Sequence, residues 1–323
     1  MATISEVAKR AGVSVATVSR VLNNKGYVHE DTRKAVVQAI ADLEYKPNTV
    51  ARSLFKKTSK MIGFVIPDIT NPFFPQLVRA IEDVMYPAGY TTILYNSDER
   101  LEHEVEFIEG MTAKYTDGFI IVSNSLKWEH LQQLSVPVVA LDRHIDERLS
   151  SVIVNNYDGA RKALEYMIQR GCKTIAHLAG PSDVFTSSER KRAYEDVMRE
   201  YGLPILLKQG HYELQKGMVT TMQLLEEHPE IDGVFAANDV MAIGALKAAA
   251  RLGVEVPRDI SFMGFDGVQW GETVTPELTT MQQPIYEMGK KAAEMLLARI
   301  QDSKIPVEHH VMDTLLKVRH SVR

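Results

Sequence analysis

Two hydrophobic patterns divide the chain. Up to residue 45, the apolar positions recur at the three- and four-residue spacing of amphipathic helices. From residue 61 onward, short apolar runs alternate with longer segments of helical spacing. Such alternation predicts parallel sheets with helices on both faces, and the runs are too numerous for one sheet. We therefore expect a small helical head followed by a two-lobed α/β core.

The head has the start and stop signals of short helices. Thr3 and Glu6 have the spacing of a capping box, which starts a first helix. Gly12 supplies the positive φ that a tight turn requires, and Ser14 is placed to cap the next helix. A helix, a short turn with glycine and a second helix form a helix-turn-helix. The second and third helices are expected over residues 15–22 and 31–44.

The second helix has an outward face suited to DNA. An exposed helix start with small side chains and one arginine fits the major groove, where arginine pairs with guanine through two hydrogen bonds. Alternatively, these residues are the solvated surface of a small three-helix bundle. The residues left to face outward are Val15, Ala16, Ser19 and Arg20, and those facing inward are Val18, Val21 and Leu22.

The apolar runs place the strands of the core. Pro137 stands just before one of them, a position where a strand tolerates proline. Gly171 and Gly253 follow segments of helical spacing and suit helix ends. The expected strands cover residues 62–66, 92–95, 119–122, 138–141, 152–154, 174–178, 233–236, 260–265 and 278–281. The clearest helices cover residues 74–86, 159–170 and 239–252.

Polar residues follow several of these strands, at the sheet edge where α/β folds bind their ligands. Asp142 and Asp266 each come directly after an apolar run. The adjacent Phe73 and Phe74 follow the first strand and suit the CH face of a sugar. A single polar residue at a strand end, such as Asn238, is more often the cap of the next helix. Polar groups at six strand ends together favour a polar small ligand.

Charge is distributed unevenly along the chain. The first 60 residues carry eleven Lys and Arg but five Asp and Glu, whereas the whole chain has a net charge of −5. A basic head on an acidic core indicates that the head meets a polyanion and the core does not.

Composition indicates a cytoplasmic protein. No apolar stretch reaches the ~20 residues that span a bilayer, and the N-terminus has no secretory signal pattern. The single cysteine, Cys172, cannot form an internal disulfide and is interpreted as a structural residue beside a turn.

The motifs do not favour an enzyme. The sequence has no phosphate-binding loop, no paired-cysteine metal site and no His-Glu-x-x-His. The adjacent His309 and His310 are more typical of a surface than of a metal site. We expect neither a cofactor nor a metal.

Thr3 to Ala8, Ala11 to Asn23 and Tyr45 to Leu54 resemble the headpiece and hinge helix of the lactose/galactose repressor family. The resemblance implies a helix-turn-helix headpiece over residues 1–46 and a hinge helix and linker over 47–60. It implies that Leu54 inserts between base steps in the minor groove, while Pro47 delays the start of the hinge helix. This helix is short, so it should order only when dimerised on DNA. The implied DNA-binding residues are Thr3, Ser14, Val15, Ala16, Thr17, Ser19, Arg20, Asn23, Tyr45, Asn48, Ala51, Arg52 and Leu54.

The core, residues 61–323, resembles the periplasmic sugar-binding proteins and the matching part of the same family, in its ribose-type form. The resemblance implies a first lobe of about 61–156 and 285–312 and a second of about 157–284 and 313–323. Phe73 and Phe74 would sandwich the sugar, with Tyr212 as a further wall. Either Ser123 or Asn124 would take an amide position of the family. The implied ligand residues are Asn71, Phe73, Phe74, Asp142, Arg143, Arg190, Tyr212, Asn238, Asp266 and Gln283.

The resemblance implies a homodimeric repressor of a sugar-utilisation operon that reads a pseudo-palindromic operator and responds to a small sugar, with ribose favoured. The chain end lacks the apolar heptads of tetrameric members, so we expect a dimer. One alternative is a global carbon-catabolite regulator activated by a phosphorylated carrier protein. Another is a sugar-binding protein with no role on DNA.

Overall fold

The computed structural model describes residues 2–45 and 58–323. The chain forms two compact units, Met1–Ser59 and Lys60–Arg323. No helix in the described ranges is long and apolar enough to cross a membrane. The predictions for the hinge at Asn48, Ala51, Arg52 and Leu54 lie outside the described residues.

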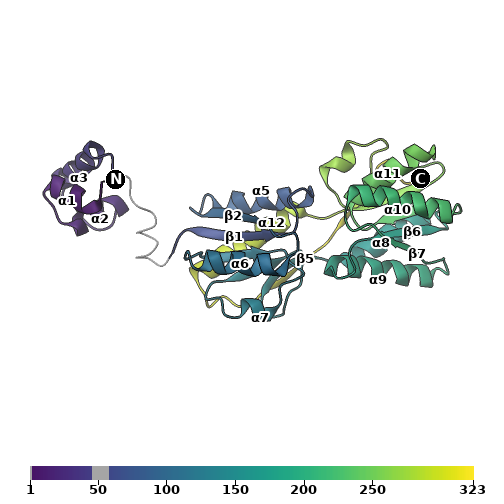
Figure 1. The fold of residues 1–323 in the computed structure, drawn as a ribbon, viewed down its shortest axis with the longest axis horizontal. Coiled ribbons are helices and arrows are strands. Elements are labelled where there is room, and N and C mark those ends of the chain that lie inside the picture. The colour runs from purple at the N-terminus through teal and green to yellow at the C-terminus, as the bar shows by residue number, and fades with distance from the viewer. Residues whose placement is uncertain (1, 46–57) are drawn as a thin grey trace. The chain divides into compact units, whose positions relative to one another are not determined.

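The first unit contains the predicted helix-turn-helix, and its local signals act as expected (Figure 1). The Thr3 hydroxyl accepts from the Glu6 amide, the Glu6 carboxylate accepts from the Thr3 amide, and Gly12 has a φ of +67°. The Ser14 hydroxyl accepts from the Thr17 amide at 3.2 Å. These bonds use amides that a helix start otherwise leaves unpaired. The helices are α1 (Ile4–Ala11), α2 (Val15–Asn23) and α3 (Glu30–Asp42).

Helix α3 begins one residue before its predicted start and ends two residues before its predicted end. The His29 side chain caps it by accepting from the Asp31 amide. Glu44 has a φ of +45°, and a residue in the left-handed region ends a helix. Val36 and Ala39 are buried against Val18 and Val21 of α2, as the spacing predicts.

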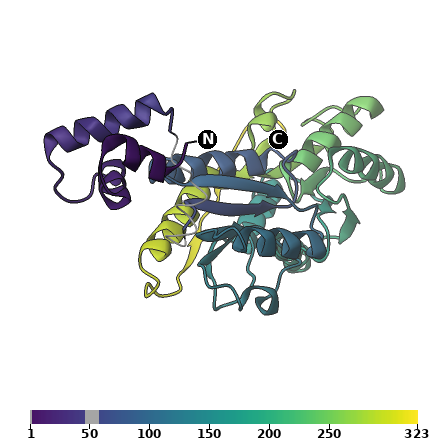
Figure 2. The ribbon, with the colours of Figure 1, turned by 60° about the vertical axis from the view of Figure 1, so that its left-hand side comes forward.

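The first lobe of the core is a six-stranded parallel sheet in the order β11-β5-β4-β3-β1-β2. Helices α5 and α12 cover one face, and α6 and α7 cover the other (Figures 1 and 2). The strands are β1 (Met61–Ile66), β2 (Thr91–Asn96), β3 (Gly118–Ile121), β4 (Val138–Leu141), β5 (Ser150–Val154) and β11 (His309–Met312). The helices are α5 (Phe73–Met85), α6 (Leu101–Thr112), α7 (Trp128–Leu131) and α12 (Ile285–Gln301).

The second lobe has a six-stranded sheet in the order β12-β10-β9-β8-β6-β7, parallel except for β12. Helices α8 and α9 cover one face, and α10 and α11 cover the other. The strands are β6 (Ile175–Ala179), β7 (Leu206–Gln209), β8 (Gly233–Ala236), β9 (Ser261–Asp266), β10 (Thr279–Gln282) and β12 (Leu315–Lys317). The helices are α8 (Asn156–Gln169), α9 (Phe185–Glu200), α10 (Leu214–Glu227), α11 (Asp239–Leu252) and the 3₁₀ helix η1 (Gln269–Glu272).

The three strands that the hydrophobic pattern misses are β7, β11 and β12, and all three lie at sheet edges. These three strands are short and half-buried or exposed, so they have no long apolar run; the fourth edge strand, β2, is longer and the pattern predicts it. All residues of β7 are half-buried or exposed, and β11 begins with two exposed histidines. Their pairing is decided by distant partners, such as His309 with Ser151 of β5.

The chain passes between the two lobes three times: from β5 to α8, from β10 to α12, and from β11 to β12. The loops after strands of both sheets meet in the cleft between the lobes. This arrangement places short segments far apart in sequence beside one cavity, as an α/β fold with two sheets requires.

One buried histidine marks the core of the second lobe. His177 of β6 has no exposed surface, and its ring stacks between Tyr194 and Phe235, with both centroid distances 5.0 Å. Its Nδ1 lies 2.9 Å from the Phe235 carbonyl oxygen, and its Nε2 has no partner within the described ranges. Burial lowers the pKa of His177 to about 4.

We expect acid to destabilise the core through this histidine. The unfolded side chain binds a proton near pH 6.5, but the folded one does so only near pH 4. Stability linked to His177 is therefore present above pH 6.5 and lost as the pH falls to 4, by at most about 3 kcal/mol. His177→Asn should flatten the pH dependence of the urea midpoint in that window, whereas exposed His310→Asn should not. Equal slopes for wild type and His177→Asn would contradict this.

Candidate functional site

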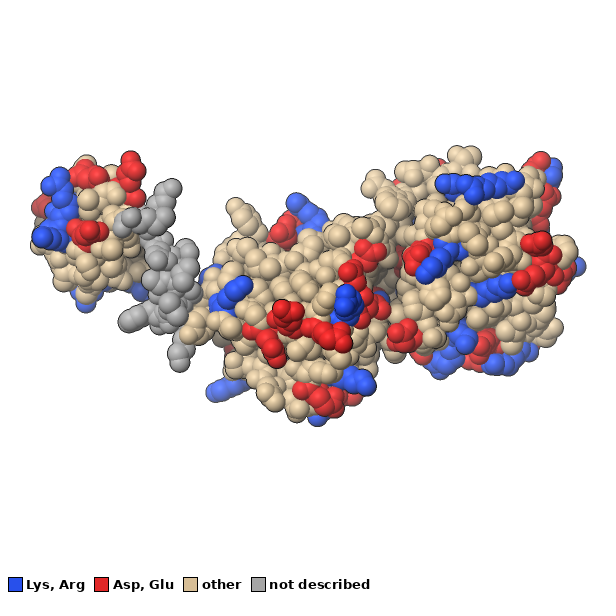
Figure 3. All heavy atoms as spheres, viewed as in Figure 1, with Lys and Arg blue, Asp and Glu red and all other residues tan. Residues whose placement is uncertain are grey.

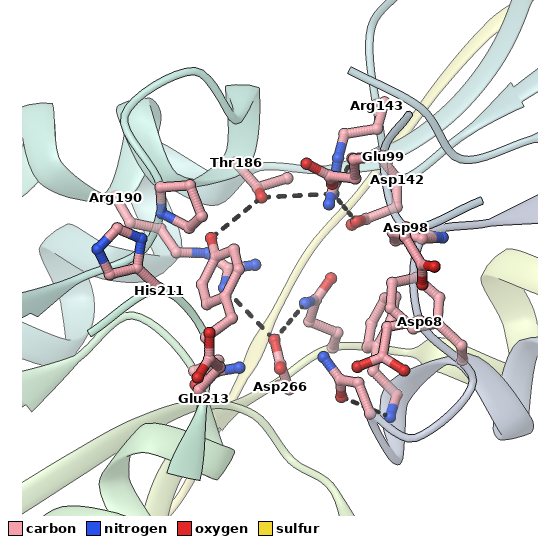
Figure 4. A pocket seen from close by; sticks show the side chains of 18 of the residues that line it. Asp68, Asp98, Glu99, Asp142, Arg143, Thr186, Arg190, His211, Glu213 and Asp266 are labelled. Carbon is pink, nitrogen blue, oxygen red and sulfur yellow. Dashed lines mark hydrogen bonds and ion pairs between the residues drawn. The ribbon is translucent and has the colours of Figure 1, made fainter. Parts of the chain in front are cut away.

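A cavity of about 400 Å³ lies in the cleft between the two lobes of the core. All of the ligand residues predicted from the sequence line it. They come from loops after strands of both sheets and from helix starts (Figure 4). The predicted residues are Asn71, Phe73, Phe74, Asp142, Arg143, Arg190, Tyr212, Asn238, Asp266 and Gln283.

On the side of the second lobe, Arg190 and Asp266 form the charged floor of the cavity. The Arg190 Nη1 lies 3.4 Å from the Asp266 Oδ1, and both side chains are almost fully buried. Gln283 donates to the same carboxylate oxygen at 2.7 Å. Burial raises the pKa of Asp266, while the Arg190 guanidinium and Gln283 act in the opposite direction.

Arg190 is fixed from four directions. Its Nε donates to the Asn156 Oδ1 at 2.9 Å, and its Nη1 also donates to the Ala237 carbonyl. Its guanidinium lies 3.8 Å from the centre of the Phe265 ring. Because Asn156 of α8, Ala237 after β8, and Phe265 and Asp266 of β9 each supply a contact, this guanidinium is preorganised for a ligand.

Asp142 and Arg143 contribute a second charged pair, from the first lobe. Asp142 has a φ of +58°, and Arg143 contacts its carboxylate directly. The Arg143 Nη1 also lies 3.4 Å from the Thr186 hydroxyl of the second lobe, which lies 3.4 Å from the Tyr212 hydroxyl. A chain of polar contacts thus joins the two lobes across the cavity (Figure 4).

The structure corrects the expected sandwich of Phe73 and Phe74. The two rings pack edge to face, with centroids 5.2 Å apart and planes at 90°. A sugar between two rings needs about 3.5–4 Å to each, so nothing fits between these two. Their positions at the start of α5 place them on one wall, and Tyr212 belongs to the other lobe.

The neighbouring Asn238 and Asp239 have different roles. The Asn238 Oδ1 caps α11 by accepting from the Met241 amide at 2.9 Å. Asp239 does not line the cavity; it accepts from the Gly267 and Val268 amides and from the Thr280 hydroxyl. Burial and the Asp266 carboxylate raise the pKa of Asp239. Asp239 is therefore a structural acceptor, whereas Asn238 both caps and faces the cavity.

Several buried polar atoms of this cavity have no hydrogen-bond partner within residues 2–45 and 58–323. Such groups are rare, because an unpaired buried donor or acceptor costs about 1–3 kcal/mol. Donors and acceptors both occur among them and come from both lobes, a mixture that complements hydroxyl groups. The atoms are the Asp142 Oδ1, the Arg143 Nε, the Asn238 Nδ2 and the Gln283 Oε1.

Sequence reasoning missed other residues of the cavity. Asp98 and Glu99 follow β2, so the rule used for the other strands would have found them. In the loop after β7, Tyr212 was predicted, but its neighbours His211 and Glu213 were missed because that edge strand has no clear pattern. Thr186 lies within the first turn of α9. The additional residues are Pro67, Asp68, Asp98, Glu99, Pro181, Thr186, His211, Glu213 and Lys216.

In the first unit, α2 presents an exposed face at its start. Val15, Ala16 and Arg20 are exposed, as the sequence predicts. The Arg20 side chain forms no hydrogen bond or ion pair within the described part of the chain. It is thus available to a ligand outside the chain.

The other headpiece residues implied by the resemblance make internal contacts. Thr3, Ser14 and Thr17 belong to helix caps. The side-chain amide of Asn23 donates to the Ser19 backbone carbonyl at 2.7 Å, and Tyr45 packs against the helical core. Tyr27, in the loop after α2, is 89% exposed and was not singled out by its sequence context.

Each of the two units contains a segment that matches a known protein family. Residues 3–48 match the bacterial regulatory proteins of the lacI family, and residues 164–322 match a periplasmic binding protein-like domain. The ribose operon repressor of Halalkalibacterium halodurans is 43% identical over 323 residues, covering 100% of this chain and 98% of the relative.

Two solved structures extend the comparison. The lac repressor dimer bound to operator and the anti-inducer ONPF has a TM-score of 0.90 at 29% identity, covering 99% of this chain and 98% of that one. A LacI family regulator from Enterococcus faecium with bound ribose has a TM-score of 0.76 at 30% identity, covering 81% of this chain and 98% of that one.

Two of the buried aspartates, Asp239 and Asp266, should differ in their effect on stability. Asp239→Ala leaves two amides and a hydroxyl without their acceptor, so we expect the free energy of unfolding to fall by about 2–4 kcal/mol. Asp266→Ala takes the acceptor from Gln283 alone, because the Arg190 Nη1 keeps the Ala237 carbonyl, and it should cost less than half as much. Urea unfolding of the two variants measures both values. Equal losses would mean that Asp266 is also a structural acceptor.

Proposed function

The chain belongs to the LacI family of bacterial regulatory proteins, and we propose that it represses a ribose-utilisation operon until free ribose releases it from the operator. One observation carries the sensor half of this proposal. The interlobe cavity brings together charged, amide and aromatic side chains of both lobes, and includes buried donors and acceptors that have no partner in the described chain.

The chemistry of the cavity supports a free sugar as the ligand. Asp142 and Asp266 can accept from hydroxyls, and Arg143 and Arg190 can donate to them. Each pair is internally neutral, so neither pair requires a charged ligand and both suit an uncharged polyol. The ribose bound by the Enterococcus faecium regulator and the ribose operon repressor among the relatives favour ribose as this polyol.

The headpiece supports binding to DNA. The exposed start of α2 is narrow enough to enter a major groove, and Arg20 is free to pair with a base edge. We propose that two copies of the chain bind one pseudo-palindromic site, as a dimer does in the operator complex of the lac repressor. The hinge residues Asn48, Ala51, Arg52 and Leu54 would contact the same site through the minor groove.

The sensor would act on the headpiece by shifting the population between different placements of the two lobes. Ribose would favour one relative placement of the two lobes, because its partners come from both. A changed placement of the first lobes in the dimer would separate the two hinge segments and weaken binding to the operator. We propose that the protein acts in the cytoplasm and has no catalytic role.

The catabolite-regulator alternative predicts the opposite sign of control. In that case a phosphorylated carrier protein would raise the affinity for DNA, and free ribose would leave it unchanged. Titrating operator DNA with the full chain, with and without ribose, distinguishes the two. A rise in the operator Kd with ribose supports the proposed repressor.

Arg20→Ala should weaken operator binding by about 1–3 kcal/mol and relax specificity at one base pair. The reason is the loss of two hydrogen bonds to one guanine. Fluorescence anisotropy with operator and random duplexes measures the effect. Lys9→Ala is the control, since it removes one charge from an exposed position of α1. An equal loss on random DNA would make Arg20 a phosphate contact.

Asp266→Ala should abolish the response to ribose and leave operator binding intact, because the headpiece folds as its own unit. A ligand that binds only the folded state stabilises it, by about 2.7 kcal/mol at 100 times its Kd. The melting temperature of the wild type should rise with ribose, and that of Asp266→Ala should not. Exposed Glu226→Ala of α10 is the control. A wild type that responds to no free monosaccharide would refute the sensor assignment.

A further inference from the structure

The loop after β2 has an unusual backbone at the wall of the cavity. Asp98 and Glu99 both line the cavity, and they have φ values of +52° and +54°. Two consecutive residues other than glycine in the left-handed region are disfavoured, so surrounding contacts must hold them. Figure 4 shows Asp68, Asp98 and Glu99 facing the cavity opposite Arg190, His211 and Glu213.

A buried carboxyl lies beneath this loop. Glu104 of α6 has no exposed surface, and it accepts from the Ser97 hydroxyl at 2.9 Å and from the Ser123 hydroxyl at 2.6 Å. The Ser97 hydroxyl accepts in turn from the Glu99 amide at 3.2 Å. The Ser123 hydroxyl accepts from two amides of its own loop, those of Ser125 and Leu126. Glu104 therefore ties together the loops that follow β2 and β3.

The second of these loops holds Glu99 directly. The side-chain amide of Asn124 (Nδ2) donates to the Glu99 carboxylate at 2.8 Å, and the Ser125 hydroxyl donates to the Glu99 backbone carbonyl at 2.8 Å. Ser123 and Asn124 thus face Glu104 and Glu99. The sequence left open whether Ser123 or Asn124 contacts the ligand. Neither side chain lines the cavity, and Glu99, which both loops hold, lines it instead.

This wall carries negative charge without a cation to balance it. Within the described ranges, Asp68, Asp98 and Glu99 have no ion-pair partner, and their hydrogen-bond donors are Thr70, Asn96 and Asn124. Arg143 and Arg190, by contrast, each contact a carboxylate of the cavity. On the face shown in Figure 3, acidic side chains also gather over α6 of the first lobe.

We propose that Glu104 is a positioning residue that holds Glu99 on the cavity wall, and that Glu99 makes the site select uncharged sugars over their phosphate esters. The inference rests on the proposed function, since it takes the cavity as the sugar site. The buried atoms without partners, on Asp142, Arg143, Asn238 and Gln283, show independently that this cavity is suited to a polar ligand. A carboxylate accepts from hydroxyls, but it repels a phosphate a few ångströms away in a cleft of low dielectric constant.

The test measures the ratio of two dissociation constants by calorimetry on the full chain, for ribose 5-phosphate and for ribose. The wild type should bind ribose at least about 100-fold more tightly. Glu99→Gln should lower this ratio roughly ten-fold, because one repulsive charge is removed. Glu104→Gln should lower it in the same direction, because glutamine cannot accept from both serine hydroxyls in the same way. Glu106→Gln, exposed on the same helix, should leave it unchanged.

A double variant separates positioning from general stability. If Glu104 acts through Glu99, Glu104→Gln should not change the ratio further once Glu99→Gln is present. A lower melting temperature with an unchanged ratio would make Glu104 only structural. Asn124→Ala, on a half-buried loop residue, tests the same link if Glu104→Gln does not fold.

The outcomes also separate this inference from the proposed function. Ribose binding with an unchanged ratio in Glu99→Gln would overturn the role of Glu99, while the sensor assignment would stand. Tighter binding of ribose 5-phosphate than of ribose by the wild type would overturn the selection itself. Binding of neither compound by the wild type would contradict the proposed function.

Discussion

The geometry of the cavity depends on the buried contacts of Arg190. This guanidinium connects Asp266 at the end of β9, the Ala237 carbonyl after β8 and Asn156 at the start of α8. Asn156 lies where the chain first passes between the lobes, and Gln283, which donates to Asp266, lies where it passes back. A ligand that contacts Arg190 or Asp266 therefore acts on groups attached to two of the three connections. This is how binding in the cavity can bias the placement of the lobes.

Such a cluster is not explained by stability alone. Removing two charges from water costs several kcal/mol per ion, and their attraction often does no more than offset it. The Arg190–Asp266 contact of 3.4 Å is long for an ion pair that must compensate burial. Asp142 and Arg143 likewise keep one polar atom each without a partner within the described ranges. Buried polar atoms without a partner are suited to a ligand whose hydroxyls complete their hydrogen bonds.

The two walls of the cavity differ in the way they are held. On the second lobe, Arg190 contacts the Asp266 carboxylate directly and is held by Asn156, the Ala237 carbonyl and the Phe265 ring. On the first lobe, Glu104 lies behind the wall and acts through serine hydroxyls and backbone amides. The first arrangement supplies contacts to the ligand, and the second sets the position and charge of the surface that the ligand meets. Selectivity and affinity thus have separate structural origins in this site.

Much of this protein is determined by its sequence at short range. The capping box of Thr3 and Glu6, the turn at Gly12 and the apolar runs of the central strands each act through neighbours in the chain, so the pattern predicts them. The strand ends also point to the residues of the cavity, because parallel sheets bring those ends to one edge.

Tertiary structure alone decided the rest. The edge strands β7, β11 and β12 form through partners distant in sequence, and their exposed faces leave no apolar run to predict them. The perpendicular packing of Phe73 on Phe74 and the difference between Asp239 and Asp266 depend on what surrounds each side chain. The connection from Glu104 to Glu99 crosses two loops, and no spacing along the chain encodes it. Local patterns follow from steric and hydrogen-bond rules between neighbours, whereas burial and pairing are set only when distant segments meet.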